Sequence, residues 1–332
     1  MADMQTEFKT FHDQIALTSG KKASLRTARN ALREKIRKYF RDVLKLNIPK
    51  FNGQGSYAMG TIVNPVNGEF DIDDGVYLQH LDTSDKRDWP TPETVHRWLV
   101  QATDGHTGQK PIDKRTCVRV RYVGQYHVDL PSYGEFNKAY LLAEKGEKGW
   151  HQSDPLALTD WFKGRVEIHG EQLRFIVRYL KVWADFQSSR RGKMSNGLIL
   201  TVMAANHFYP DTRDDICFAN ILRAIADAVP VVFCVYNPVD ATEELTLRLT
   251  DQQKNRFQEV VADAADAATE AIKIDDRHEA SNIWRIQFGD RFPAVGKKDD
   301  VNQKKAITTK LATVYAAKNP SRPWAVADDT VV

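Results

Sequence analysis

Two aspartates separated by one residue stand inside an apolar run at residues 70–78, FDIDDGVYL. In an extended strand successive side chains alternate between faces, so Asp71 and Asp73 share one face while Ile72 and Asp74 take the other. Neighbouring carboxylates repel each other unless a cation lies between them. A hard divalent cation, bound by carboxylate oxygens and nucleotide phosphates, removes that repulsion, and Mg²⁺ fits this description best. The strand therefore predicts a magnesium site with Asp71 and Asp73 as ligands.

A second acidic pair overlaps the first. Glu69 and Asp71 are also spaced by two residues and would also share a face. Asp73 lies deeper in the apolar run than Glu69, which favours the Asp71/Asp73 pair. The Glu69/Asp71 pair stays open as an alternative.

A Gly-Ser pair, Gly55 and Ser56, precedes these aspartates by about fifteen residues. Glycine lets the backbone approach a phosphate closely, the Ser56 hydroxyl can donate to phosphate oxygens, and a helix starting here would add its positive end. Phosphoryl transfer needs metal ions, positioned phosphates and an aligned nucleophile rather than covalent help from the protein. We therefore predict that Gly55 and Ser56 bind a nucleotide phosphate beside the acidic pair.

A third metal ligand is expected on a nearby strand. Residues 115–130, RTCVRVRYVGQYHVDL, read as two β-rich runs joined at Gly124, and the second run carries His127 and Asp129 on one face. Asp129 is the predicted third ligand. A nucleotide contact and a hydrogen-bonded sheet histidine both fit His127, and the second is the commoner.

A long amphipathic helix is predicted over residues 24–45, because apolar residues recur with the 3.6-residue period and Ser24 is a suitable N-cap. Its outer face is strongly basic, with Lys21, Lys22, Arg26, Arg29, Arg33, Lys35, Arg37, Lys38, Arg41 and Lys45 against only Glu34 and Asp42. Nucleic-acid contact and a solvated face both fit this row, and a solvated face is the commoner outcome.

The remaining pattern changes from β-rich to helical along the chain. Residues 138–149 are expected to form a charged, flexible edge, and the apolar run at 231–236 is expected to be a buried strand or an extended core segment. We predict an α+β fold, with a mixed sheet and long N-terminal helix in residues 1–165, a helical domain in 166–296 and a flexible tail in 297–332.

Composition excludes several other classes of protein. The chain has 332 residues and a formal charge of only +3, which gives no bulk argument for nucleic-acid binding. No apolar run approaches the twenty residues of a membrane span, and no GxGxxG or GxxxxGK[ST] motif is present. The three cysteines, Cys117, Cys217 and Cys234, stand in apolar surroundings and are expected to be reduced core residues of a cytoplasmic protein.

The order Gly-Ser, Asp-hydrophobic-Asp and a later strand Asp resembles the nucleotidyltransferase core shared by DNA polymerase β, the poly(A) and CCA-adding enzymes and the cGAS/DncV-like nucleotidyltransferases, or CD-NTases. Residues 55–78, GSYAMGTIVNPVNGEFDIDDGVYL, are most similar to the CD-NTases of bacterial anti-phage (CBASS) systems. Residues 281–296, SNIWRIQFGDRFPAVG, resemble the closing WRxxFGxxFP segment of many CD-NTases. The likeness extends from about residue 5 to residue 296.

This resemblance implies two further nucleotide-binding residues. In the family a helix of the form +hhKxW carries a lysine that contacts the nucleotide triphosphate, and a serine in the next helix-start turn contacts it too. RYLKVW followed by SNG matches this pattern and assigns the two roles to Lys181 and Ser195. A surface lysine and a plain N-cap are the alternative interpretations of these two residues.

The resemblance also implies an activity. Asp71, Asp73 and Asp129 would hold two Mg²⁺ ions in a cleft between the two domains. NTPs, including ATP and GTP, would be joined with release of pyrophosphate into a cyclic di- or trinucleotide that activates an effector during phage infection. Template-independent transfer to RNA ends or to a protein acceptor stays open as an alternative. We expect a cytoplasmic monomer with no membrane contact, and residues 297–332 are a candidate handle for a regulatory or conjugating CBASS protein.

Either of two arrangements would argue against this interpretation. Asp129 could lie far from Asp71 and Asp73, or one of the three aspartates could be buried against a cationic side chain instead of a metal.

Overall fold

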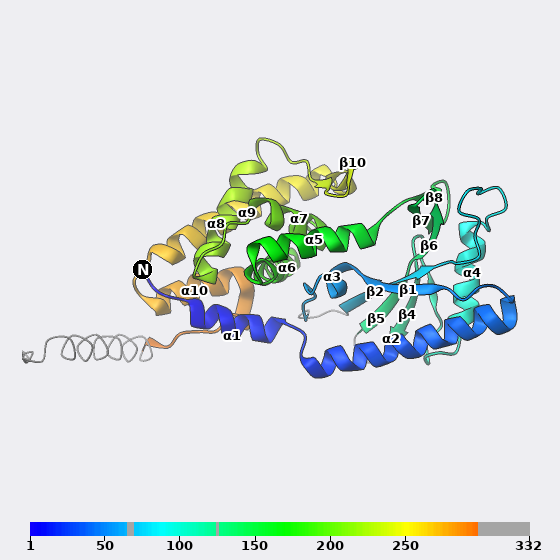
Figure 1. The fold of residues 1–332 in the computed structure, drawn as a ribbon. Helices are drawn as coiled ribbons and strands as arrows, with labels where there is room; N and C mark the ends of the chain where they lie inside the picture. The colour runs from blue at the N-terminus through cyan, green and yellow to red at the C-terminus, as the bar shows by residue number, and fades with distance from the viewer. Residues whose placement is uncertain (65–69, 124–125, 298–332) are drawn as a thin grey trace, which may run out of the picture.

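The chain folds into a sheet-containing half and a helical half (Figure 1) in the computed structural model, which describes residues 1–64, 70–123 and 126–297. The sheet-containing half holds α2 (Ser19–Tyr39), a π-helical turn (Phe40–Leu44), β1 (Lys50–Gln54), α3 (Gly55–Ala58), β2 (Phe70–Tyr77), α4 (Pro92–Thr103), β3 (Ile112–Asp113), β4 (Val118–Tyr122), β5 (Tyr126–Leu130), β6 (Ser132–Phe136), β7 (Ala139–Glu144) and β8 (Gly149–Gln152). The helical half holds α1 (Gln5–Ile15), α5 (Pro155–His169), α6 (Gln172–Arg191), α7 (Gly197–His207), α8 (Asp214–Ala228), β9 (Tyr236–Asn237), β10 (Asp240–Glu244), two 3₁₀ turns (Leu245–Arg248 and Gly289–Arg291), α9 (Asp251–Lys273) and α10 (Arg277–Phe288). The predicted α+β class, with a mixed sheet followed by helices, is confirmed.

The acidic strand β2 lies in the middle of the sheet. The strand order is β3-β4-β5-β2-β6-β7-β8, with β1 paired to β2 in addition. β2 runs parallel to β5 and β6 and antiparallel to β1, so the sheet is mixed. Neighbours on both sides hold β2 in one register, which fixes where its side chains point.

Helices α2 and α4 cover one face of this sheet. Leu32 and Ile36 of α2 and Leu99 of α4 are fully buried with the strand residues Ile72 and Val128. The face of β2 that carries Ile72 is therefore committed to this core, and the alternate face is left for the cleft between the two halves.

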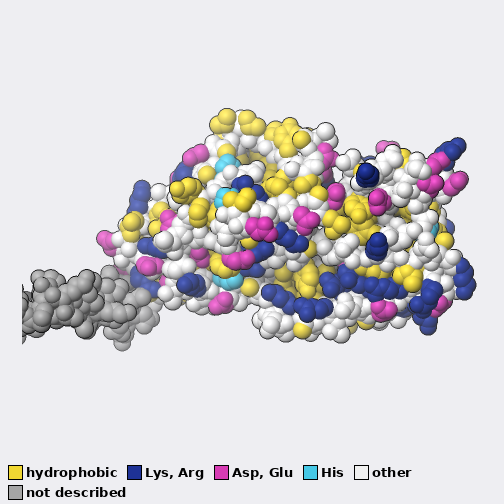
Figure 2. All heavy atoms as spheres, viewed as in Figure 1, with side chains coloured by type: hydrophobic (Ala, Val, Ile, Leu, Met, Phe, Trp, Pro, Cys, Tyr) yellow, Lys and Arg dark blue, Asp and Glu magenta, His cyan; other side chains and the backbone are white. Residues whose placement is uncertain are grey.

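α2 begins earlier than the sequence pattern suggested. Its N-cap is Thr18, whose hydroxyl accepts from the backbone N–H of Lys21, so Ser24 lies inside the helix and the prediction of a Ser24 cap is wrong. Several basic side chains of α2 form a row on the surface (Figure 2). Within the same helix Arg37 pairs with Glu34, which lowers the net positive charge of the row. Nucleic-acid contact by this face stays a prediction.

The helical half has a core of its own, and the N-terminal helix contributes to it. Phe8 and Phe11 of α1 are fully buried, and the Phe8 ring lies 5.0 Å from Trp284 and 5.1 Å from Phe292, centroid to centroid. α1 therefore packs with the helical half, although it lies within the predicted range 1–165 of the sheet-containing domain. The boundaries of the three predicted ranges stay predictions.

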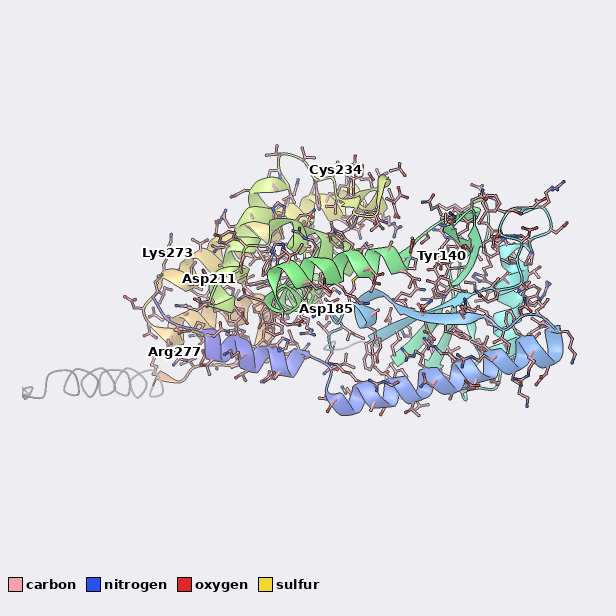
Figure 3. The ribbon with its side chains drawn as sticks, in the orientation of Figure 1. Tyr140, Asp185, Asp211, Cys234, Lys273 and Arg277 are labelled. Atoms are coloured by element: carbon pink, nitrogen blue, oxygen red, sulfur yellow. The ribbon has the colours of Figure 1, made fainter. Side chains whose placement is uncertain are left out.

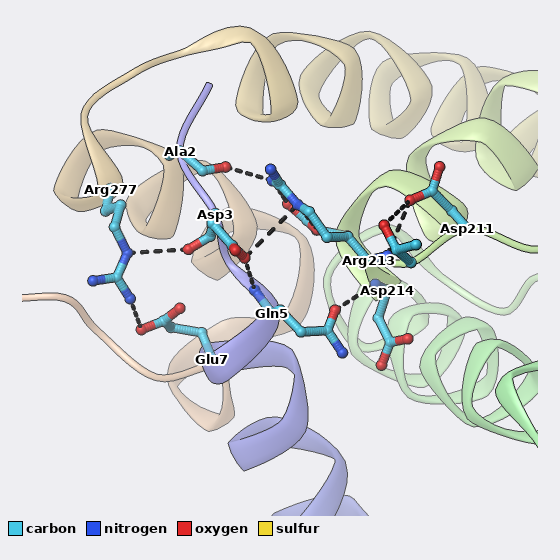
Figure 4. A network of polar contacts seen from close by, with 10 residues as sticks. Ala2, Asp3, Gln5, Glu7, Asp211, Arg213, Asp214 and Arg277 are labelled. Carbon is cyan, nitrogen blue, oxygen red and sulfur yellow. Dashed lines mark hydrogen bonds and ion pairs between the residues drawn. The ribbon is translucent and has the colours of Figure 1, made fainter. Parts of the chain in front are cut away.

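Polar contacts attach the first residues to the same half (Figure 4). Arg277 donates from Nε to the carbonyl of Asp3 at 3.1 Å and from Nη2 to Glu7 at 2.6 Å, and Arg213 donates to the carbonyl of Ala2. The chain then crosses at residues 16–18 to α2, which packs on the sheet.

Two local expectations are wrong. Residues 138–149 are not a flexible edge, because β7 and β8 pair in this segment and join the main sheet. The run at 231–236 is not a buried strand: Val231 and Val232 are 81% and 62% exposed, and Cys234 is exposed at the edge of the helical half (Figure 3), so only Cys117 and Cys217 are core cysteines. Apolar composition favoured burial here, but most of the segment is exposed after α8, with Val235 alone buried in the core of the helical half and Tyr236 beginning β9. Within the described residues, no helix is long and apolar enough to cross a membrane.

Candidate active site

A cleft of about 710 Å³ lies where the two halves meet. The sheet side supplies Gly55 and Ser56 of α3 and Asp71 and Asp73 of β2 to its lining, and the helical side supplies residues of α5, α6 and α7. Lys181 and Ser195 are among the helical lining residues. The cleft thus brings together side chains more than a hundred positions apart in the sequence.

The alternation of β2 and its pairing with β5 collect three acidic side chains on one face. In the parallel β2/β5 ladder Asp71 lies opposite His127 and Asp73 lies opposite Asp129. Side chains opposite each other on neighbouring strands point to the same face. Ligand atoms of Asp71, His127 and Asp129 all lie within 4.8 Å of one another. Asp129 therefore lies close to Asp71, whereas Asp73 is not a member of this group and is placed beside Asp129 by the strand register.

Asp73 is the aspartate most affected by this crowding. Burial raises its pKa, and the negative charges of Asp129 and Asp71 raise it further, to about 7. Without a cation, Asp73 therefore carries a proton up to neutral pH. A divalent cation would remove this repulsion, and oxygen atoms from carboxylates are the ligands that hard divalent cations prefer. The residues present therefore fit a metal of this kind.

Asp71 is in a different state although it lies two residues away. Its Oδ1 is 3.0 Å from His127 Nε2, and about half of its side chain is exposed. Burial alone would raise the pKa of Asp71, but the His127 hydrogen bond and the nearby charge of Arg119 outweigh burial and hold the pKa below its usual value. Asp71 therefore stays ionised and available to a cation. His127 serves as its sheet partner.

Asp129 has a cationic partner that the sequence interpretation did not include. Arg119 donates from Nε to Asp129 Oδ1 at 2.6 Å and from Nη2 to Asp129 Oδ2 at 2.7 Å, and its Nη2 lies 3.5 Å from Asp71 Oδ2. A buried cationic partner of one aspartate is an arrangement that argues against a metal site. The pairing with Arg119 therefore argues against Asp129 as a metal ligand. An ionised carboxylate offers about four lone-pair positions, so Asp129 keeps acceptor capacity beside Arg119.

The pairing of Arg119 with Asp129 could have been predicted from the sequence. Arg119 and Asp129 lie opposite each other in the antiparallel β4/β5 hairpin. Both lie five residues from Gly124, the turn residue inferred from the sequence, so a hairpin centred on that glycine aligns them. Gly124 itself and Glu69, the alternative ligand, lie outside the described residues.

The Gly-Ser pair forms the single turn of helix α3, next to the acidic face. Gly55 has φ +61°, a conformation that other residues rarely adopt. A Cβ atom on Gly55 would lie 2.3 Å from Asp73 Oδ2, so only glycine allows this approach. α3 spans four residues and contributes little of the helix dipole that the sequence interpretation invoked. Its contribution to the cleft is the backbone and the Ser56 hydroxyl.

Lys181 reaches the sheet side of the cleft from α6. Its Nζ donates to Thr61 Oγ1 at 3.0 Å and lies 3.4 Å from the Thr61 carbonyl. Burial lowers the pKa of Lys181, the charge of Arg178 lowers it further, and Asp73 opposes both, which leaves the pKa at about 8. The surface-lysine interpretation is therefore wrong, because this ammonium group lies inside the cleft.

Ser195 also lines the cleft from the helical side, just before α7. The N-cap of α7 is Asn196, whose side chain accepts from the N–H groups of Leu198 and Ile199, so the plain N-cap interpretation of Ser195 is wrong. Among the described residues the buried Ser195 hydroxyl has no hydrogen-bond partner. A buried hydroxyl without a partner is costly unless a ligand or water completes it.

The arrangement can therefore hold one extended anion against one acidic face. Ser56, Lys181 and Ser195 offer donors from both halves of the cleft, and Asp71 and Asp73 also line it. A triphosphate with divalent cations has the charge pattern that complements such a cleft. Roles for the individual residues stay predictions.

Two descriptions of protein families match the chain in order. "Cyclic GMP-AMP synthase DncV-like, nucleotidyltransferase domain" matches residues 49–133, and "Cyclic GMP-AMP synthase, C-terminal domain" matches residues 170–298. Together they account for well over half of the chain.

Individual relatives have low pairwise sequence identity to this chain. A cyclic GMP-AMP synthase of Escherichia albertii is 26% identical over 258 residues, a match that covers 74% of this chain and 56% of that protein. A cyclic AMP-AMP-AMP synthase of an Acinetobacter species is 23% identical over 306 residues, covering 88% of this chain and 86% of that protein. The crystal structure of the apo form of Vibrio cholerae DncV superposes with a TM-score of 0.74 at 19% identity, covering 88% of this chain and 96% of that one.

The structural likeness confirms the fold, and the two family descriptions fall on the two halves that form the cleft. Because these two family descriptions cover well over half of it, the chain belongs to the cGAS/DncV-like nucleotidyltransferases.

Proposed function

We propose that this protein is a Mg²⁺-dependent nucleotidyltransferase that joins NTPs, without a template, into a cyclic di- or trinucleotide and releases pyrophosphate. The observation that carries the proposal is the shared acidic face of Asp71, Asp73 and Asp129 beside a cleft that Ser56 and Lys181 line from opposite halves. Such a cleft supplies what phosphoryl transfer requires: a place for metal, donors for phosphates and room for an acceptor.

In the proposed reaction one set of residues binds the donor triphosphate and another set holds the metal ions. Ser56, Lys181 and Ser195 bind and orient the donor triphosphate, and Asp71, Asp73 and Asp129 would hold two Mg²⁺ ions. Bound metal ions of this type neutralise phosphate charge and favour ionisation of a bound hydroxyl. The ribose oxygen of the acceptor forms a bond to the α-phosphorus, the bond to the β-phosphate oxygen breaks, and pyrophosphate leaves in line. An acidic group of this face takes the proton of the attacking hydroxyl.

The proposed products follow the relatives, whose names are cyclic GMP-AMP and cyclic AMP-AMP-AMP synthase. ATP and GTP are therefore the first substrates to test. The proposed role is anti-phage signalling in the cytoplasm, where the cyclic nucleotide activates an effector protein.

Purified protein incubated with an equimolar mixture of the four NTPs and Mg²⁺, and no nucleic acid, is expected to yield a phosphatase-resistant nucleotide and pyrophosphate. A cyclic product has no terminal phosphate, so phosphatase does not degrade it. Mass spectrometry of the product identifies bases and ring size. Absence of NTP consumption under these conditions would contradict the proposal.

The basic row of α2 favours one alternative acceptor (Figure 2). Lys22, Arg26 and Lys38 of this helix are exposed, which suits an RNA backbone. A template-independent transferase acting on RNA ends would incorporate labelled NTP only when RNA is added. Incorporation into the protein itself would point instead to a protein acceptor.

Affinity for NTP is expected to fall above pH 8. Lys181 binds a triphosphate only when protonated, and its pKa in the free protein is about 8, lowered by burial and by Arg178. Affinity is therefore complete below pH 8, and the KM for NTP is expected to rise by up to about tenfold for each pH unit above it. Measurement of KM from pH 7 to pH 9.5 checks this expectation.

A Lys181→Arg variant provides the control for that pH dependence. Guanidinium stays protonated throughout this range, so the rise in KM should flatten. An unchanged pH profile in the variant would assign the titration to another group.

A further inference from the structure

Three cations on one face of α6 hold three successive backbone carbonyls of the sheet-containing half. Positions 174, 178 and 181 share a helix face because they are spaced by four and three residues. The contacts are Arg174 Nε to Met59 O at 3.0 Å, Arg178 Nη2 to Gly60 O, and Lys181 Nζ to Thr61 O at 3.4 Å. Helix α6 therefore grips the segment 59–61 in register.

The gripped segment is joined rigidly to the Gly-Ser turn. The N–H groups of Met59, Gly60 and Thr61 donate to the carbonyls of Gly55, Tyr57 and Ser56, at 3.0, 3.2 and 2.8 Å. The same three residues therefore bond the α3 turn through their N–H groups and bond α6 through their carbonyls. A shift of this segment would move Ser56.

The backbone conformation of Gly60 lets α6 approach the segment 59–61 closely. Gly60 has φ +71°, and a Cβ atom there would lie 3.2 Å from Arg174 Nε, so glycine permits this approach. Arg178 also lies 2.5 Å, through Nη1, from His12 Nε2 of α1, and its guanidinium lies 5.9 Å from the centre of the Phe175 ring. Arg178 thus connects α1, α6 and the 59–61 segment at one point.

Neither arginine lines the cleft, whereas Lys181 does. We propose that Arg174 and Arg178 are positioning residues for NTP binding: they clamp the segment 59–61 to α6 and thereby place Ser56 of one half at the distance from Lys181 that a triphosphate spans. This inference rests on the proposed function. Lys181 then exchanges Thr61 for phosphate oxygens when nucleotide binds, while the two arginines keep the halves in place.

The expected effect is on binding more than on stability. Each guanidinium donates to a backbone carbonyl of the segment 59–61, and loss of such a charged donor corresponds to about 10-fold or more in affinity when it positions a ligand group. Arg165 offers a matched control, because it donates from α5 to the carbonyl of Ala205 at 2.7 Å within the helical half. Arg165→Met removes the same kind of bond without touching the contact between halves.

A double-mutant cycle tests the proposal. Dissociation constants of a non-hydrolysable α,β-methylene analogue of the consumed NTP are measured by calorimetry, with Mg²⁺, for Arg178→Met, Lys181→Met and both together. Arg178→Met is expected to raise the dissociation constant about 10-fold in the wild-type background, and less than about threefold when Lys181 is already methionine. Arg178→Lys should recover most of the affinity, since an ammonium group can also donate to the Gly60 carbonyl, and Arg165→Met should bind like the wild type.

The possible results distinguish failure of the positioning role from failure of the proposed function. Additive effects of Arg178→Met and Lys181→Met, or equal losses in Arg178→Met and Arg165→Met, would overturn the positioning role and leave the proposed function standing. A wild-type protein that consumes NTPs but whose Arg178→Met variant binds them unchanged would do the same. A wild-type protein that neither binds nor consumes NTPs would instead overturn the proposed function itself.

Discussion

Replacing Asp71 and Asp73 together with alanine is expected to reduce product formation by about 10³-fold or more, because the variant loses two of the three acidic groups of the site. Removal of a single charge-stabilising group from an active site costs about 10²–10³-fold in rate, and here the metal would be lost as well. Pyrophosphate release from NTPs, with mass spectrometry of the products, measures the loss. Turnover equal to that of the wild type would falsify the metal assignment.

Measurement of thermal stability shows whether this loss of activity comes from loss of the acidic site or from unfolding of the variant. The pKa of Asp73 is raised from 3.8 to about 7, by burial first and then by Asp129 and Asp71, so the folded state binds this proton more tightly than the unfolded state. Ionisation of Asp73 therefore lowers stability progressively between about pH 4 and pH 7, and the full cost is present above pH 7. At pH 8 without metal, Asp73→Ala alone should therefore melt at the wild-type temperature or higher, whereas loss of Asp71, whose pKa is lowered in the folded state, offsets part of this gain in the double variant. A variant with alanine at Asp88 and Asp160, both exposed, carries the same charge change and should keep full activity.

Gly55→Ala is expected to lower activity by about 10²-fold, more than its effect on stability would suggest. A methyl group at this position would lie 2.3 Å from Asp73 Oδ2, so either the α3 turn or the carboxylate must move. Misplacement of a reacting group by about 1 Å can cost 10²-fold in rate. The strain of alanine at φ +61° adds a destabilisation of about 1 kcal/mol. Activity and thermal unfolding are measured on the same preparation.

Gly170→Ala and Gly146→Ala supply the matched controls. Both glycines have positive φ, +84° and +89°, and a Cβ atom on either would meet nothing within 4 Å. These variants carry the backbone strain without the collision. If they lose as much activity as Gly55→Ala, the loss comes from strain and stability, and Gly55 has no special relation to Asp73.

The sequence sufficed for the parts of the site that depend on local alternation. Asp71 and Asp73 share a face because β2 is extended, and the turn chemistry around Gly124 was enough to propose a second strand ending near Asp129. Arg119 was missed because a strand register must be assigned before two facing residues can be recognised as partners. Residues 231–236 were predicted to be buried from their apolar composition alone. Composition indicates burial only where another element covers the segment, and here Val235 is the one residue that is buried.

The contacts of α6 show the same limit at longer range. Arg174 and Arg178 look like solvated positions of an amphipathic helix, and nothing in their spacing names the carbonyls of Met59 and Gly60 as partners. Those carbonyls lie more than a hundred residues earlier, and only the meeting of the two halves brings them within reach. Resemblance to a family identified Lys181, but it did not identify the residues that hold the surrounding backbone.

The aromatic core of the helical half joins the two ends of the described chain. Phe8 and Phe11 contact Phe288 and Phe292, so the second half cannot complete its interior until the chain has been synthesised past residue 292. At about 5–20 residues per second, the newly made α1 waits on the order of tens of seconds for these rings while the sheet-containing half is already able to fold. During translation, α1 therefore exposes two phenylalanines beside a folded neighbour, and chaperone binding to the nascent chain would protect this segment.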